Sequence, residues 1–130
     1  MEQTIKLIIV DDHEMVLQGL NALLGNQPGI EVLDVFLNGN DAAEAIDRLN
    51  PDIVLTDINM PIINGFETAQ LIRKKKPEMK IIMLSMENKE GYVKKAKEEN
   101  ISAYVTKDAP INELIAVIKK VYLGETHFNV

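Results

Sequence analysis

The chain has 130 residues, of which 46% are hydrophobic and 26% charged, and it contains no cysteine. This composition is typical of one globular domain, and it excludes disulfides and thiolate metal sites. Fourteen basic against twenty acidic side chains give a net charge of −6, so we expect this chain itself to bind no nucleic acid. No apolar run approaches the roughly 20 residues that cross a bilayer, which predicts a cytoplasmic protein without a membrane segment.

Five short apolar runs rich in β-branched residues are predicted strands, at residues 6–10, 30–36, 53–56, 80–84 and 103–106. Between them, apolar residues recur at helical spacing, and glycine or proline closes the helical segments, as at Gly25 and Pro77. Strands that alternate strictly with helices indicate an α/β sandwich with a parallel sheet and right-handed crossovers. In such a sheet, a functional site is expected at the carboxyl ends of the strands.

Acidic residues follow two of the predicted strands. Asp11 and Asp12 come after the first strand and Asp57 after the third, so the fold brings three carboxylates to one edge. Clustered carboxylates repel one another unless a cation lies between them, and oxygen ligands of this kind suit Mg²⁺. The alternative is structural: Asp11 and Asp12 could cap the helix that begins near His13, where aspartate is favoured.

A hydroxyl and an ammonium group are predicted at the same edge. Ser85 follows the fourth strand and Lys107 the fifth, and together they suit an anion that binds beside the metal. A carboxylate such as that of Asp57 can attack phosphorus and form an aspartyl phosphate, whose charge a metal ion and a lysine would neutralise. A phosphatase with an aspartate nucleophile is a weaker alternative, because Asn59 stands where its general acid would be needed and cannot donate a proton in that role.

Four segments strongly resemble the receiver domain of bacterial two-component response regulators: IIVDDHE (8–14), IVLTDINMPIINGFE (53–67), IIMLSMEN (81–88) and AYVTKDAP (103–110). The resemblance implies the flavodoxin-like (CheY-like) fold, with strand order 2-1-3-4-5. It also implies a role for each site residue. Asp57 accepts the phosphoryl group, Ser85 and Lys107 contact its oxygens, and Ser85 and the aromatic residue Tyr104 together form the switch. Mg²⁺ is bound by Asp12, Asp57 and the backbone carbonyl of Asn59, and by Asp11 through water.

Within that family, the runs DDHEMVLQGLNALL (11–24) and Lys107-Asp108-Ala109 resemble the NarL/FixJ branch. Members of this branch usually carry a carboxyl-terminal helix-turn-helix domain of the LuxR type. The resemblance therefore implies a histidine kinase as phosphoryl donor, a receiver homodimer as one possible assembly, and a DNA-binding output domain that this chain does not contain. We expect residues 1–124 to form the receiver and residues 125–130 to begin a linker or tail. A receiver that signals alone, by protein contact, is the alternative.

Three further residues carry expectations of their own. His13, beside the acidic pair, is interpreted as a helix-start residue and not as a metal ligand or a phosphoryl relay. Gly19 lies inside a predicted helix, where glycine is unfavourable, which indicates close packing against the sheet. Gly65 is expected to free the backbone of the loop after Asp57.

Overall fold

Five strands and five helices alternate along the chain in a computed structural model that describes residues 4–86 and 90–128. The order is β1 (Ile5–Val10), α1 (Glu14–Gly25), β2 (Ile30–Phe36), α2 (Gly39–Leu49), β3 (Ile53–Asp57), α3 (Gly65–Lys75), β4 (Lys80–Ser85), α4 (Glu90–Glu98), β5 (Ala103–Thr106) and α5 (Ile111–Tyr122). Each predicted strand is present, and the bounds differ by one residue at most. The last two residues of the segment expected to be a linker or tail lie outside the described part.

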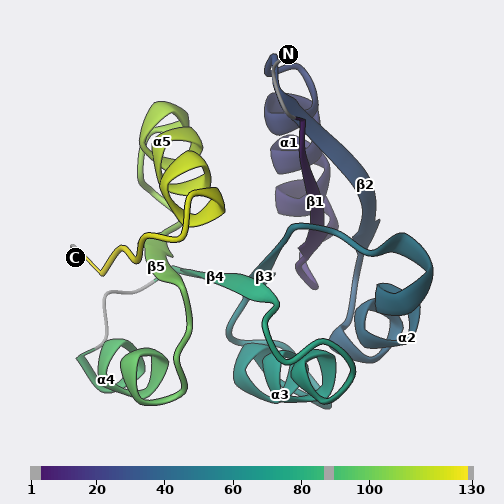
Figure 1. The fold of residues 1–130 in the computed structure, drawn as a ribbon, viewed down its shortest axis with the longest axis vertical. Helices are drawn as coiled ribbons and strands as arrows, with labels where there is room; N and C mark the ends of the chain where they lie inside the picture. Colours follow the sequence, from purple (N-terminus) through teal and green to yellow (C-terminus); the bar gives the residue numbers. More distant parts are fainter. Residues whose placement is uncertain (1–3, 87–89, 129–130) are drawn as a thin grey trace.

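The strands form one parallel sheet in the order β2-β1-β3-β4-β5. Helices α1 and α5 cover one face and α2, α3 and α4 the other (Figure 1). Each face has its own buried apolar cluster, because the central strands are apolar on both sides. The three-layer sandwich and the strand order expected from the sequence are thus confirmed.

The strand register sets which side chains meet at the carboxyl edge. Asp57 ends β3 opposite Leu84 of β4, and Ser85 ends β4 opposite Thr106 of β5. Val10, the last residue of β1, pairs with Thr56. The residue that directly follows β1 therefore lies beside the end of β3, and the residue that follows β5 lies beside the end of β4, one strand further along the same edge.

Two glycines have roles other than those expected. The prediction for Gly19 is wrong, because a Cβ added there would meet nothing within 4 Å. Glycine is required at position 65 for steric reasons, because an added Cβ would collide with the backbone carbonyl oxygen of Asp57. The positive φ in this loop belongs to Ile62, at 72°, a left-handed conformation that is costly for a β-branched residue.

After α5, the chain turns back along the edge of the sheet. The His127 N–H donates to the carbonyl of Ser102, and the His127 carbonyl accepts from the Tyr104 N–H, so this segment pairs with β5. Phe128 packs against the buried cluster on the α2, α3 and α4 face. Within residues 4–86 and 90–128, no helix has the length and apolar character needed to span a membrane.

Candidate functional site

The side chain of Asp57 is buried at the carboxyl end of β3, with 5% of its surface exposed. Its Oδ1 accepts a hydrogen bond from the backbone N–H of Ile58 at 2.9 Å and lies 3.2 Å from Nζ of Lys107. The preceding residues of β3 are all buried, which fixes the strand and with it the carboxylate. The structure thus presents Asp57 as a buried carboxylate beside a cation.

Lys107 connects the end of β5 to the acidic residues after β1. Its backbone N–H donates to the carbonyl of Ser85 at 2.8 Å, which continues the pairing of β5 with β4. Its Nζ lies 2.7 Å from Oδ2 of Asp11, and the lysine side chain is only 8% exposed. One buried ammonium group is therefore shared between Asp11 and Asp57.

The balance of charge at this site is negative. Burial raises the pKa of Asp57, the nearby charge of Asp11 raises it further, and Lys107 acts in the opposite direction. Because the net shift is upward, the single lysine does not offset the cost of burying the ionised carboxylate. A bound cation would lower this cost. Protonation of the Asp57 carboxylate would also lower it, because it removes the buried charge.

The acidic pair after β1 is not used to cap α1. The N-cap residue of that helix is His13, whose side chain makes no capping hydrogen bond. Asp11 Oδ1 accepts the His13 N–H at 2.9 Å, which holds the turn between β1 and α1. The alternative from the sequence, in which both aspartates cap α1, accounts for the hydrogen bond to Asp11. It does not account for the position of the Asp12 carboxylate.

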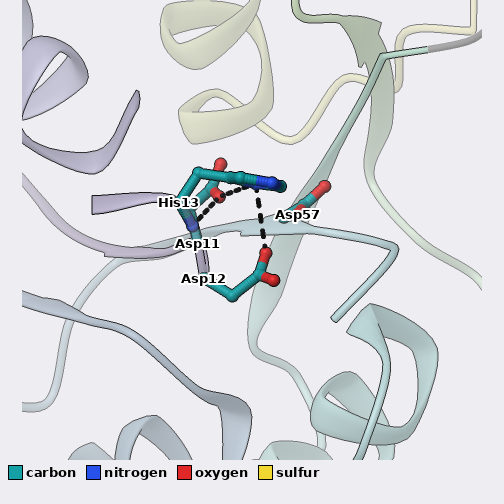
Figure 2. A group of neighbouring side chains, drawn as sticks. All are labelled: Asp11, Asp12, His13 and Asp57. Atoms are coloured by element: carbon teal, nitrogen blue, oxygen red, sulfur yellow. Dashed lines mark hydrogen bonds and ion pairs between the residues drawn. The ribbon is translucent and has the colours of Figure 1, made fainter. Parts of the chain in front are cut away.

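Four side chains form a group that fits a divalent cation: Asp11, Asp12, His13 and Asp57 each offer a ligand atom, and these atoms lie within 4.8 Å of one another (Figure 2). Asp12 Oδ1 is buried and accepts no hydrogen bond from any described residue, and the Nδ1 atom of His13 lies 3.3 Å from it. Three carboxylates against one lysine also leave an excess of negative charge. The three carboxylates, and the buried Asp12 oxygen that accepts no hydrogen bond, therefore fit a divalent metal ion.

Ser85 and Tyr104, which the sequence analysis linked as a switch, both lie in the interior. Ser85 ends β4 with 1% of its surface exposed, and Tyr104 on β5 is fully buried. Tyr104 belongs to the same apolar cluster as Ala96 of α4. The structure thus places the hydroxyl at the site edge and the aromatic ring in the layer that supports α4.

Tyr92 was not found by sequence reasoning. Its hydroxyl donates to Oδ1 of Asn59 at 2.8 Å, and its ring packs against Phe66 with centroids 6.2 Å apart. This contact joins α4 to the loop that follows Asp57. A tyrosine on an amphipathic helix does not by itself predict a hydrogen bond to the loop after Asp57, because that contact depends on how α4 docks against the sheet.

The fold, the acidic cluster and the buried lysine together define a receiver-type domain. Residues 7–119 match the response regulator receiver domain family, and the chain belongs to that family. Its relatives and structural neighbours place it in the NarL/LuxR branch of response regulators.

The transcriptional regulatory protein DegU of Brevibacillus brevis is 32% identical over 128 residues, which cover 98% of this chain and 54% of DegU. LnrK of Bacillus subtilis is 37% identical over 120 residues, 92% of this chain and 54% of LnrK. Among solved structures, a LuxR-family DNA-binding response regulator from Staphylococcus aureus superimposes with a TM-score of 0.84 at 36% identity, covering 91% of this chain and 98% of that one. The chain thus spans about half the length of these two curated relatives.

Proposed function

We propose that this receiver accepts a phosphoryl group on Asp57 from a phosphorylated histidine of a sensor kinase and that this modification switches an output. The observation that supports the proposal best is the position of Asp57. It is a buried carboxylate that ends a central strand, lies 3.2 Å from Lys107 Nζ, and belongs to a cluster with excess negative charge. A purely structural aspartate would not need this surplus of acidic neighbours.

The transfer reaction follows from the side chains present. A carboxylate oxygen of Asp57 attacks the phosphorus atom, an O–P bond forms, and the P–N bond to the donor imidazole breaks. The leaving imidazole takes a proton from solvent. Lys107 neutralises charge on the phosphoryl oxygens, and we infer that the Ser85 hydroxyl donates to them.

We assign the metal to the same edge. Asp12, Asp57 and the backbone carbonyl of Asn59 would hold Mg²⁺ directly, and Asp11 through water. When bound, the ion supplies positive charge that stabilises the transferring phosphoryl group. Asp11 has Lys107 on one oxygen and the His13 N–H on the other, which is consistent with an indirect role for it.

The conformational response runs from the site to the buried layer behind it. A phosphoryl group on Asp57 would draw in the hydroxyl of Ser85 and change the space available to Tyr104, which packs beneath α4. Coupling of this kind amounts to about 1–3 kcal/mol, so it shifts populations between two conformations.

The output is proposed from the relatives. Because several are named as transcriptional regulators and the chain covers about half of their length, we infer that this receiver controls transcription in the cytoplasm through a carboxyl-terminal helix-turn-helix domain. Either a receiver homodimer or the docking of that domain would transmit the change. Signalling by a receiver without an output domain is the alternative.

Phosphorylation is tested by incubating the chain with acetyl phosphate and Mg²⁺ and measuring its intact mass. The wild type should gain the mass of one phosphoryl group, whereas Asp57→Asn should gain none, because an amide is a poor nucleophile of similar shape. Asp47→Asn, on the exposed face of α2, is the matched control and should be labelled like the wild type. Full labelling of the Asp57 variant would refute the assignment.

The switch is tested with Ser85→Ala. This variant keeps Asp57, Lys107 and the acidic cluster, so it should still accept the phosphoryl group. Tyrosine ring NMR signals should report the response: the Tyr104 signals shift in the phosphorylated wild type and stay in place in the variant. An unchanged response in Ser85→Ala would mean that another group carries the coupling.

A further inference from the structure

The imidazole of His13 lies inside the acidic cluster, although the sequence analysis assigned it no chemical role. Its Nδ1 is 3.4 Å from Oδ1 of Asp11 and 3.3 Å from Oδ1 of Asp12. In Figure 2 the ring extends over the Asp12 carboxylate on the side where Asp57 lies. The helix start does not require this position, because His13 makes no side-chain capping bond.

The ligand atoms differ in how strongly other groups already engage them. Asp11 Oδ2 is held by Lys107 at 2.7 Å, and Asp11 Oδ1 accepts the backbone N–H of His13. Asp12 Oδ1, by contrast, is buried and accepts no hydrogen bond from the described residues. Asp57 is engaged by the Ile58 N–H and by Lys107, both through Oδ1, whereas both oxygens of Asp11 are engaged. This leaves Asp12, His13 and the Oδ2 of Asp57 as the set best able to face an ion together, with one nitrogen and two carboxylate donors.

The spacing within this set suits a shared ion. Two ligands that bind at about 2.1 Å in neighbouring octahedral positions are about 3.0 Å apart. The separation of 3.3 Å between His13 Nδ1 and Asp12 Oδ1 is close to that distance, and a small rotation of the exposed imidazole would close the gap. Together with the Asn59 carbonyl assigned above, these three side chains still leave octahedral positions open for water or a phosphoryl oxygen.

We propose that His13 Nδ1 is a direct metal ligand and sets the ion preference of this site. With it, the site binds borderline divalent transition-metal ions such as Co²⁺ more tightly than carboxylates alone would. Imidazole nitrogen binds such ions well, whereas Mg²⁺ favours oxygen ligands and retains its water. The inference rests on the metal-binding part of the proposed function, and it adds a residue and a class of ion to it.

The test compares Mg²⁺ and Co²⁺ binding to the wild type and two variants by isothermal titration calorimetry. In His13→Asn, asparagine is a favourable N-cap residue, so α1 is retained. His127→Asn is the matched control, since the chain has only these two histidines and His127 lies along β5. NMR of the Co²⁺-loaded wild type adds a direct readout, because a ligating imidazole gives strongly shifted ring proton signals.

We expect His13→Asn to weaken Co²⁺ binding at least about 10-fold and to change the Kd of Mg²⁺ less than about 3-fold. His127→Asn should bind both ions like the wild type, and shifted imidazole signals should come from His13. Equal losses for both ions, or unchanged Co²⁺ affinity, would overturn the inference while leaving the Mg²⁺ site of the proposed function intact. Failure of the wild type to bind either ion would instead overturn the metal-binding part of the proposed function, and the inference with it.

Discussion

The ammonium group of Lys107 forms its shorter ion pair with Asp11, 2.7 Å away, and not with Asp57, which is 3.2 Å away. The lysine is therefore anchored by a residue that is itself 1% exposed and that lies 96 positions earlier in the chain. Asp11 thus fixes the position of the positive charge beside Asp57, the proposed phosphoryl acceptor. It also ties the end of β5 to the end of β1, so this ion pair joins two distant parts of the chain.

Lys107→Met should destabilise the metal-free protein by about 3 kcal/mol, because it leaves two buried carboxylates without their shared cation. Urea unfolding in the presence of EDTA measures the change in the free energy of unfolding. Asp57→Asn should stabilise the Lys107→Met variant more than it stabilises the wild type, since the charge that it removes has lost its cation. If the effects of the two single changes simply add in the double variant, the coupling between Lys107 and Asp57 is absent.

Asp57→Asn alone should stabilise the metal-free protein at neutral pH. The native pKa of Asp57 is raised above its ordinary value of 3.8, so the folded state holds the proton more tightly than the unfolded state does. The stability that the wild type gains from this tighter proton binding is fully present below pH 3.8, and it is lost as the pH rises through the native pKa of Asp57. Calorimetric Tm values should therefore favour the variant at neutral pH, with an advantage that shrinks on acidification. A constant advantage at every pH would exclude ionisation as the cause.

The two glycines discussed above should respond in opposite directions to substitution by alanine. Gly19→Ala, at an exposed helical position with free space around it, should stabilise the protein by about 0.5–1 kcal/mol. Gly65→Ala should destabilise it, because the new methyl group collides with the Asp57 carbonyl oxygen. Denaturant unfolding of both variants checks the pair, and stabilisation by Gly65→Ala would show that the loop can shift without cost.

The chain alone should not bind DNA. Its net charge is −6, and phosphorylation makes it more negative, so activation cannot work by attracting DNA phosphates to this domain. Fluorescence anisotropy of a labelled duplex at low salt measures this, with the phosphorylated and unphosphorylated chain compared. Micromolar binding by either form would contradict the proposal that the receiver acts only as the switch and that a separate output domain binds DNA.

Much of the fold was predictable because local patterns and topology agree. Apolar, β-branched runs identify the strands, and the rule that parallel strands end at a common edge places Asp11, Asp57 and Lys107 together. The structure confirms their proximity. Their catalytic and binding roles, like those of Ser85, Tyr104 and the Asn59 carbonyl, remain predictions.

Other features depend on packing that a pattern does not encode. The position of the His13 ring over the acidic pair and the bond from Tyr92 to Asn59 depend on side-chain rotamers and on the docking of α1 and α4. The prediction of close packing at Gly19 was wrong because it relied only on glycine being unfavourable in a helix, whereas the space around this position is open. For Gly65 the sequence indicated the loop correctly, but the reason is a backbone approach that only the three-dimensional structure reveals.

The central claim, that Asp57 is the phosphoryl acceptor, is tested most directly by locating the modified residue. The chain is phosphorylated with acetyl phosphate and Mg²⁺, and the acyl phosphate is reduced with borohydride, which converts the modified aspartate to homoserine. Tandem mass spectrometry of the peptides then identifies the position. Homoserine at position 57 alone is the predicted result, and homoserine at position 11 or 12 would contradict the account.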